Sequence, residues 1–416
     1  MNRFASCIFT ATNTNTTNAR GVSSQSINKN QTDVLVICAG IAGMCTSHYL
    51  LRNSKCTRVT LIDKESDIAS LTSRINGGLI CPSLSTSWTN YPIFTGNDSL
   101  LSMILSTIKG KQESSLLSFD PKLLTDKRFL SFISAWARRK PLMNNANDAI
   151  SDMGYLSMDC FNNDNSLKSI DYDRAATGTK TDKGLSNADS SGDAYKFCNG
   201  LRRQILELHG YGENCRFRFI PNTIVDSFLT NNEGENKRID AVNLIDSRND
   251  NTQKKQCWDI DNIVISAGNQ SYDICSMLGI PCPIFPVKGY IIAFHSKVDI
   301  DVNLQLGASK AFVSPLGNNK YHLSGCADFT SHYNNAEKAY EIDKIRVDTL
   351  INEARATFFP DMKVQSMHCG HRPLSPDDIP IIGSISKYDN VFLNTGSGSK
   401  GWTQGKKTQH IFVHLL

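Results

Sequence analysis

The sequence contains no long hydrophobic run. Its longest apolar stretch, Val34 to Cys45, is interrupted by glycines and falls short of the roughly 20 residues that a membrane-spanning helix needs, so no transmembrane span is expected. The 13 cysteines are scattered singly without a C-x-x-C pair, which favours reduced thiols over disulfides or a zinc site. No basic run with interleaved aromatics occurs and the net charge is only +4, so nucleic-acid binding is not expected.

The N-terminal segment lacks acidic residues. Residues 1–32 contain Arg3, Arg20 and Lys29, many serines, threonines and asparagines, and a single apolar patch. This composition resembles a mitochondrial or plastid transit peptide. The alternative is a disordered, low-complexity N-terminus that carries no address, in which case a cytoplasmic location is expected.

The remaining 384 residues have the composition of a globular protein, since the whole chain is 40% apolar and 20% charged. Its most informative part spans residues 33–63. Residues 34–37 predict a short buried strand, 38–43 a tight turn, 44–52 a helix and 59–62 a second strand. Asp63 follows twenty residues after Gly43, the spacing at which a carboxylate binds a ribose hydroxyl while the helix N-terminus faces a pyrophosphate. The unit therefore predicts a dinucleotide site.

The turn departs from the G-x-G-x-x-G pattern at its first position, which is Cys38. A cysteine fits there only if its backbone avoids positive φ, so the substitution predicts weaker phosphate binding without removing the fold. Gly40, where the backbone approaches the phosphate, and Gly43, where the helix touches the strand, are both retained. A nucleotide-free α/β unit is the less favoured interpretation, because strand, turn, helix, strand and acid occur in order.

The periodicity of the remaining chain predicts further elements. Two amphipathic helical stripes are expected between residues 99 and 142, at Leu101, Ile104, Leu105 and Ile108 and at Phe129, Phe132, Ile133 and Trp136. Residues 144–192 are rich in Asn, Asp, Ser and Gly, and part of this segment is expected to be loop or disordered. A helix at 193–208 and strands at 216–220 and 261–268 are expected to extend the first sheet. Strands at 286–294 and 321–325 and a helix at 343–359 are assigned to another domain.

The C-terminal part carries the most specific motifs. They are Gly370-His371-Arg372-Pro373, then Pro376-Asp377-Asp378-Ile379-Pro380-Ile381-Ile382-Gly383, and then the Asn394-Thr395-Gly396 turn with Gly401-Trp402-Thr403. Together with the N-terminal unit, Ala267-Gly268 and Pro286-Val287-Lys288-Gly289-Tyr290, they resemble the D-amino acid oxidase superfamily of FAD enzymes, especially its D-amino acid dehydrogenase small subunits. The resemblance runs in order from Asp33 to Thr403.

The resemblance implies an α/β fold in which a Rossmann-like, glutathione-reductase-like FAD domain carries an inserted antiparallel α+β substrate domain. Residues 33–98, 190–283 and 369–416 are assigned to the FAD domain, and 99–189 and 284–368 to the substrate domain. The implied reaction is oxidative deamination of a D-amino acid by hydride transfer from Cα to flavin N5, as part of amino acid catabolism. A glycine- or sarcosine-type amine oxidase is the alternative, and the electron acceptor is a quinone or oxygen.

The same resemblance assigns site residues. Arg372 matches the arginine that clamps the substrate carboxylate, a task suited to a planar fork of donors. An alternative is a surface ion pair with Asp377. Tyr290 is a second catalytic candidate, although an aromatic residue on such a strand is more often packed. The expected FAD contacts are Cys38, Gly40, Ile41, Ala42, Gly43, Asp63, Lys64, Ser73, Asn76, Gly77, Val225, Ala267, Gly268, Gly396, Ser397, Gly398, Gly401 and Trp402.

A metal and several family features are not expected. His368, Cys369 and His371 make a poor zinc site because a fourth ligand is missing. Ser397 stands where the family has a histidine, the closing helix after Thr403 is curtailed, and part of the substrate domain is missing between Lys183 and Asp189. These departures leave a rival interpretation from another class, a non-catalytic, cofactor-poor remnant of the fold.

Overall fold

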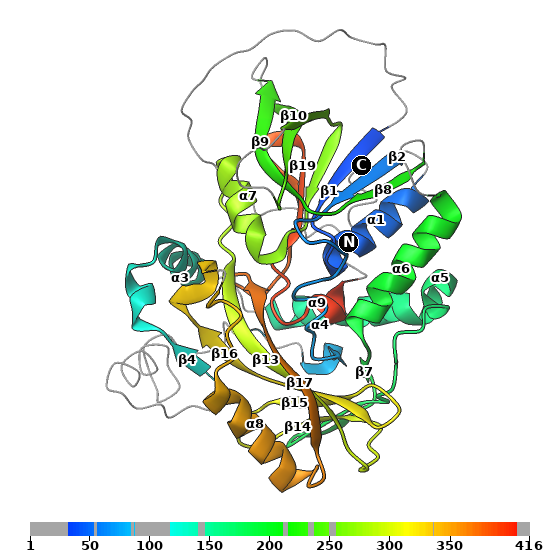
Figure 1. The fold of residues 1–416 in the computed structure, drawn as a ribbon, viewed down its shortest axis with the longest axis vertical. Coiled ribbons are helices and arrows are strands. Elements are labelled where there is room, and N and C mark those ends of the chain that lie inside the picture. The colour runs from blue at the N-terminus through cyan, green and yellow to red at the C-terminus, as the bar shows by residue number, and fades with distance from the viewer. Residues whose placement is uncertain are drawn as a thin grey trace.

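The computed structural model describes residues 32–53, 56–84, 87, 117–139, 146–210, 215–231, 237–248, 255–335 and 337–405. The expected transit peptide, the apolar stripe at 101–108 and residues 406–416 lie outside these residues. Figure 1 shows the chain arranged around two large sheets, one in the upper and one in the lower half of the view.

The first large sheet has six strands, in the order β18-β19-β12-β1-β2-β8. β1 (Thr32–Ile37) pairs in parallel with both β2 (Cys56–Ile62) and β12 (Asn262–Ile265). β8 (Phe217–Ile220) and β19 (Tyr388–Thr395) extend the parallel part, and β18 (Ile381–Ile385) closes it antiparallel. Four consecutive residues of β1 are buried because a parallel sheet is covered on both faces. The predicted strands at 34–37, 59–62, 216–220 and 261–268 are confirmed.

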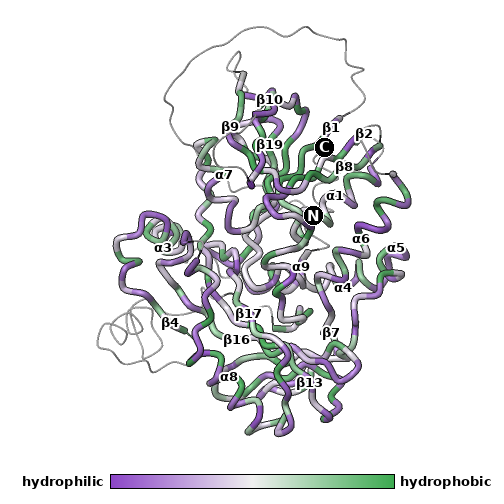
Figure 2. The backbone as a smooth tube through the Cα atoms, in the orientation of Figure 1, coloured by the Kyte–Doolittle hydropathy of each residue, from purple (hydrophilic) through white to green (hydrophobic). Residues whose placement is uncertain are grey.

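Different elements cover the two faces of this sheet. Val34 and Val36 pack with α1 (Ile41–Arg52) and α6 (Ala194–His209), whereas Leu35 and Ile37 pack toward α7 (Ser271–Met277) and a three-stranded sheet. That sheet consists of β9 (Thr223–Asn231), β10 (Arg238–Asp246) and β11 (Gln256–Asp259). The predicted helix at 193–208 is α6, whose first turn is capped by the side chain of Asp193. Figure 2 shows hydrophobic residues gathered in the central strands.

Part of residues 144–192 is loop, as expected, since residues 169–178 form no helix or strand, but the helices of this segment were not predicted. The segment forms α4 (Ala146–Asn163), α5 (Asn165–Lys168) and the short strands β5 (Thr179–Thr181), β6 (Gly184–Ser186) and β7 (Ser190–Ser191). The buried residues Ile150, Met158 and Phe161 are spaced for one helix face, and the many polar residues that masked this period lie on the exposed faces. The aromatic ring of Phe161 packs against that of Trp402, with 5.4 Å between centroids.

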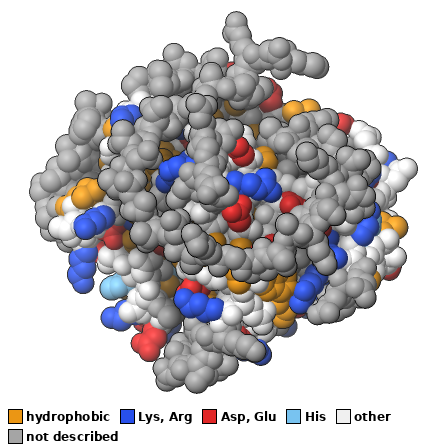
Figure 3. Space-filling model, turned by 90° about the horizontal axis from the view of Figure 1, so that it is seen from above, with side chains coloured by type: hydrophobic (Ala, Val, Ile, Leu, Met, Phe, Trp, Pro, Cys, Tyr) orange, Lys and Arg blue, Asp and Glu red, His pale blue; other side chains and the backbone are white. Residues whose placement is uncertain are grey.

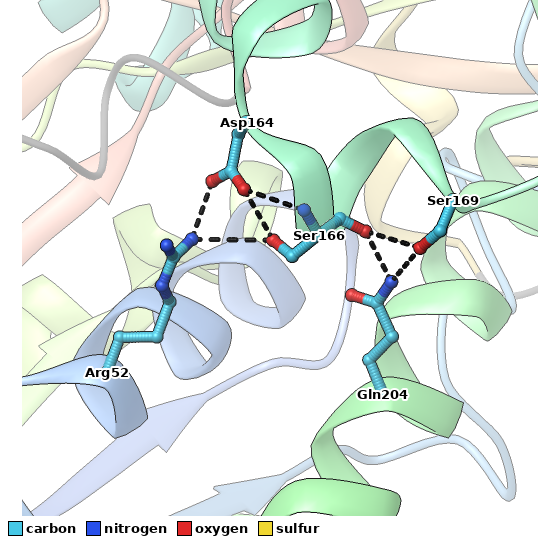
Figure 4. Close-up of polar contacts among 5 residues, drawn as sticks. All are labelled: Arg52, Asp164, Ser166, Ser169 and Gln204. Carbon is cyan, nitrogen blue, oxygen red and sulfur yellow. Dashed lines mark hydrogen bonds and ion pairs between the residues drawn. The ribbon is translucent and has the colours of Figure 1, made fainter.

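The packing of α4 and α5 also differs from the sequence-based division of the chain. Their buried residues belong to the core beside β1, α1 and α6, rather than to the second sheet with which residues 99–189 were grouped. Figure 4 shows how α5 is fastened there. Arg52 of α1 donates to Asp164 at 2.5 Å, Asp164 caps α5 through the Ser166 N–H, and Gln204 of α6 donates to Ser169 Oγ at 2.9 Å.

The second large sheet is mostly antiparallel, in the order β17-β13-β16-β15-β14-β5-β6, with β4 (Leu117–Phe119) beside β16. The other strands are β13 (Phe285–His295), β14 (Asn303–Gln305), β15 (Phe312–Pro315), β16 (Lys320–Phe329) and β17 (Lys363–Leu374). α8 (Lys344–Thr357) covers one face, which confirms the predicted helix at 343–359 and the two predicted strands. The assigned domain boundary at residue 369 falls inside β17.

Helix α3 (Lys127–Arg139) joins this sheet at its edge. Phe129 and Phe132 are buried against Phe285, which confirms the second amphipathic stripe, and Trp136 of the same stripe is buried as well. The remaining short elements are β3 (Leu79–Ile80), which pairs with β7, the 3-10 turns η1 (Pro82–Leu84), η3 (Pro121–Thr125), η5 (Gly268–Gln270) and η6 (Ser331–Asn334), and α9 (Gly401–Gln404).

No described helix is both long enough and apolar enough to cross a membrane. On the face seen in Figure 3, the described basic and acidic side chains are intermingled. This distribution agrees with the small net charge of the sequence.

Candidate functional site

A cavity of about 580 Å³ lies between the two large sheets. Its wall comes from segments far apart in the sequence: the turn after β1, residues 69–77, η5, the inner face of β13, β16 and β17, and residues 394–403. Almost all predicted contact residues of the cofactor lie along this wall. Gly43, Lys64 and Val225 do not line it. Lys64 lies in the loop after β2, and Val225 is buried in β9.

At one end of the cavity, Asp63 closes the turn after β1. Its Oδ2 accepts the Ala39 N–H at 2.6 Å and its Oδ1 accepts the Glu65 N–H at 2.9 Å. The N-terminus of α1 opens into the cavity beside it, since Gly40, Ile41 and Ala42 line the wall. The first turn of α1 carries no acidic residue, so its partial positive charge is available to an anion. The Ser73 hydroxyl accepts the Ile41 N–H at 3.0 Å.

The glycine positions of the turn behave as the sequence predicts. A Cβ on Gly43 would stand 1.9 Å from the carbonyl oxygen of Cys38, so only glycine lets the helix approach the strand so closely. At Gly40 an added Cβ would be in ordinary van der Waals contact with Ser73 Oγ, 3.4 Å away, so space alone does not require glycine there.

The expectation that Cys38 avoids positive φ is wrong. Its φ is 84°, and its N–H donates to the Ile62 carbonyl at 2.8 Å, which holds the backbone in the glycine-like turn. A non-glycine residue in this region costs roughly 1–3 kcal/mol, which the surrounding structure must offset. Burial, together with the neighbouring Asp63 carboxylate, raises the pKa of the Cys38 thiol, so the sulfur stays protonated.

Cys38→Gly should therefore stabilise the protein. The free energy gained by relieving the strained backbone should exceed the entropic cost of ordering a glycine on folding. The expected gain in unfolding free energy is about 1 kcal/mol. Chemical denaturation of the two proteins measures it. Cys38→Ala is the matched control because it removes the thiol and keeps the Cβ. Equal gains for both variants would contradict the role of strain.

Several glycines form part of the cavity wall. At Gly268, Gly370 and Gly401, as at Gly40, an added Cβ would find no atom closer than 3.4 Å and would project into the cavity. Such a wall lets a large planar or extended ligand lie against peptide groups. With the helix N-terminus and Asp63 at one end, the residues present fit a flavin dinucleotide.

The loop 396–402 forms the wall near the other end. Gly396 and Gly398 have positive φ angles of 76° and 54°, and the Gly398 N–H donates to the Pro373 carbonyl at 2.9 Å. Ser397 forms a bridge with Leu374, and the Trp402 indole N–H donates to the Gly192 carbonyl at 3.2 Å. The loop is thus fixed to β17 and to the segment between β7 and α6. On the opposite wall, a Cβ on Gly77 would meet Ser324 Oγ at 2.6 Å, and His322 Nδ1 lies 2.9 Å from the Asn76 carbonyl oxygen.

Arg372 lies on the cavity face of β17. Its Nη1 donates to the Cys326 carbonyl at 2.6 Å. Cys326 has a φ of 59° at a bulge in β16, where the register against β13 shifts, and this turns its carbonyl toward the arginine. The guanidinium lies over Gly289, whose Cβ position is 2.5 Å from Nη2. The strands therefore hold the fork in place and leave the rest of its donors for a ligand.

The alternative role of Arg372, an ion pair with Asp377, is wrong. Asp377 pairs with Arg139 of α3 instead. Among the described residues, no carboxylate lies within ion-pair distance of Arg372. Burial lowers the pKa of the guanidinium below its ordinary value. The structure thus contains a half-buried cation that faces the cavity.

The structure places Tyr290 away from the cavity. Because side chains alternate along a strand, Val287, Gly289 and Ile291 face the cavity while Tyr290 is buried under α8. Burial and the nearby Asp328 raise its pKa. Lys288 is also buried, and its Nζ donates to the Glu341 carbonyl.

Trp136, Asp378 and Lys400 are among the wall residues that the sequence did not reveal as parts of the site. Trp136 was recognised only as a core residue. Asp378 and Lys400 form a buried ion pair. The sequence signal that could have identified this pair was its charge: two consecutive acids occur in a proline-flanked turn, and a lysine occurs inside a glycine-rich loop.

His371, next to the clamp, makes stability depend on pH. Burial, with the charges of Lys288 and Arg128, lowers its pKa to about 4. Protonation is therefore disfavoured in the folded protein, and stability present above the unfolded pKa of about 6.5 is lost as the pH falls toward 4. The expected loss from this group is about 3 kcal/mol. Urea unfolding at a series of pH values should show a smaller loss in His371→Phe than in His368→Phe, an exposed position of the same strand. If the unfolding free energies of the two variants depended on pH in the same way, His371 would not be the source of the loss.

Comparisons with known proteins agree with this geometry. A family model described as "FAD dependent oxidoreductase" (DAO) matches residues 33–406. A D-amino acid dehydrogenase from Dechloromonas aromatica is 24% identical, over 89% of this chain and 93% of that protein. Glycine oxidase from Bacillus cereus superposes with a TM-score of 0.57 at 13% identity, over 92% and 94% of the two chains. L-proline dehydrogenase from P. horikoshii gives 0.61 at 12% identity, over 93% of each chain.

Proposed function

Because the chain belongs to the DAO family of FAD-dependent oxidoreductases, we propose that it oxidises an amino acid, and specifically deaminates a D-amino acid by hydride transfer from Cα to flavin N5. The observation that supports an amino acid substrate is Arg372, a guanidinium fixed by Cys326 and Gly289 and facing the cavity without a carboxylate partner among the described residues. A planar fork of donors suits a carboxylate.

The proposal divides the cavity into two ends. The six-stranded sheet is the Rossmann-like, glutathione-reductase-like cofactor domain, in which Asp63 binds the ribose and the N-terminus of α1 the pyrophosphate. Residues 396–402 lie along the flavin ring. The eight-stranded sheet is the substrate domain. FAD supplies a two-electron hydride acceptor when bound.

The protein's own residues position the substrate. Arg372 binds the carboxylate and thereby fixes Cα of the amino acid relative to the ring, which is the main contribution a flavoenzyme needs from such a residue. The wall formed by Trp136, Val287 and Leu374 excludes water from the reacting end. The released imino acid is hydrolysed by water to a 2-oxo acid and ammonia.

A glycine- or sarcosine-type amine oxidase is the second candidate. The fold similarity to glycine oxidase favours it, and the clamp would bind the carboxylate of glycine equally well. The test is a panel of D-amino acids, their L-enantiomers, glycine and sarcosine, with formation of 2-oxo acid and reoxidation by oxygen or a soluble quinone analogue measured for each. Faster turnover of D-amino acids supports the main proposal. Preference for glycine or sarcosine supports the alternative, and no turnover of any of them refutes both.

Asp63→Ala should weaken FAD binding without changing substrate preference. The substitution removes a ribose acceptor and also the bonds that close the turn, so the Kd for FAD should rise at least about 10-fold. Fluorescence quenching of FAD by apo-protein measures the Kd. Asp67→Ala is the matched control, because Asp67 pairs with Arg202 outside the cavity. An unchanged Kd, or an altered ratio of kcat/KM between two amino acids, would contradict the assignment.

A further inference from the structure

The cavity wall contains a buried ion pair near the clamp. Lys400 Nζ donates to Asp378 Oδ2, and the two side chains are only 10% and 3% exposed. Both residues line the cavity. The desolvation of two charges offsets most of their attraction, so stability alone is a poor explanation for such a pair.

The surrounding backbone presents the Asp378 carboxylate in a fixed position. Asp378 has a φ of 62°, and its N–H donates to the Ser375 carbonyl at 3.2 Å. Its Oδ1 would lie 2.4 Å from a Cβ on Gly398, so the missing side chain of Gly398 makes room for the carboxylate against the loop 396–402. The Lys400 N–H donates to the Ser397 carbonyl at 2.9 Å. Turn and loop therefore fix both partners.

Of the described residues that line the cavity, three carry a carboxylate. Asp63 and Glu65 belong to the turn at the dinucleotide end. Asp378 belongs to the clamp end, because the Cβ position of Gly398 lies 2.4 Å from Asp378 Oδ1 and the Gly398 N–H donates to the carbonyl of Pro373, the residue after Arg372. Its charge also favours the protonated form of the Arg372 guanidinium. Asp328 is paired with Arg346 and does not line the cavity. A ligand whose carboxylate is bound by Arg372 thus has Asp378 as its neighbouring acid.

We propose that Asp378 is a catalytic residue that accepts an N–H of the substrate amine and stabilises the positive charge that forms on this nitrogen during oxidation. This inference depends on the proposed function. As the Cα–H bond breaks, hydride carries its electron pair to the oxidised flavin of FAD, and the nitrogen lone pair becomes the second bond of C=N. The flavin is reduced by two electrons and the substrate nitrogen becomes cationic. A fixed carboxylate beside that nitrogen favours the transition state over the neutral amine.

Lys400 has a positioning role in this arrangement. Removing it alone would leave a buried carboxylate without its cation, and removing Asp378 alone would leave a buried ammonium, so single variants risk misfolding. The double variant Asp378→Asn/Lys400→Met keeps the net charge and approximate volumes. Asp378→Gly/Lys400→Met is a second design, because glycine adopts the positive φ without strain.

The test uses FAD-loaded wild type and double variants under anaerobic conditions. Stopped-flow absorbance gives the rate constant of flavin reduction at a saturating amino acid, and perturbation of the flavin spectrum gives the Kd of the matching 2-hydroxy acid. The hydroxy acid has the same carboxylate and no nitrogen. Asp328→Asn/Arg346→Met serves as the control, since it removes a buried ion pair that does not line the cavity.

The expected result is a reduction rate about 100-fold lower in the Asp378 double variants, with hydroxy acid binding within about 3-fold of wild type and FAD content unchanged. The control should reduce at close to the wild-type rate. Reduction of the Asp378 double variants at the wild-type rate would overturn the inference while leaving the proposed function intact. Failure of wild type to be reduced by any amino acid would instead refute the proposed function.

Discussion

Arg372→Lys should raise the KM for amino acids by about 100-fold or more while FAD remains bound. A lysine keeps the positive charge but cannot reproduce two parallel donors, and the loss of a charged hydrogen bond in a buried site corresponds to about 3 kcal/mol. Steady-state kinetics with an amino acid, and with an amine of the same side chain that lacks the carboxylate, measures the effect. The KM for the amine should not change with the substitution. Equal losses for both compounds would rule out a carboxylate clamp.

Gly289→Ala tests the same clamp without replacing Arg372. Its Cβ would stand 2.5 to 2.7 Å from three guanidinium atoms of Arg372, so the flexible side chain must move while the strands stay in place. We expect a rise in KM in the same direction, with arginine still present and with little change in melting temperature. Gly307→Ala, where no atom lies within 4 Å of the Cβ position, is the matched control.

Gly43→Ala should abolish FAD binding and lower the unfolding free energy by about 3 kcal/mol or more. The added Cβ would stand 1.9 Å from the Cys38 carbonyl oxygen and 2.9 Å from Ser266 Oγ, and the carbonyl belongs to the backbone of the turn. Relief requires the helix to move away from the sheet, which displaces the N-terminus of α1 from the pyrophosphate position. Thermal unfolding and FAD content check the prediction, with Gly307→Ala again as the control. A folded, fully loaded variant would contradict the turn geometry.

The sequence predicts the scaffold of the site better than its fine geometry. Short strands such as 34–37 and the helix at 193–208 carry strong periodic signals, and the structure contains them. The helix at 146–163 was missed because its few apolar residues are diluted by Asn, Asp and Ser on the exposed faces. In this segment the polar composition hid the helical spacing of the apolar residues.

Individual side chains of the site depend on tertiary contacts that no local pattern encodes. Cys38 adopts positive φ because the strand beside it fixes its backbone, whereas local preference predicts the opposite. Side chains alternate between the two faces of β13. Because Gly289 faces Arg372 in the cavity, the neighbouring Tyr290 lies on the opposite face, away from the site of catalysis. The pairing of Asp378 with Lys400 joins two loops 22 residues apart in the chain, which sequence spacing alone does not reveal.

The most direct test of the account is anaerobic reduction of the purified, FAD-loaded protein by single enantiomers of an amino acid. We expect the visible absorbance of the oxidised flavin to disappear on addition of the D-enantiomer. We also expect Arg372→Lys to raise the half-saturating concentration of the amino acid by about 100-fold. A protein that binds FAD in the cavity but keeps its oxidised spectrum with every amino acid tested would contradict the central claim.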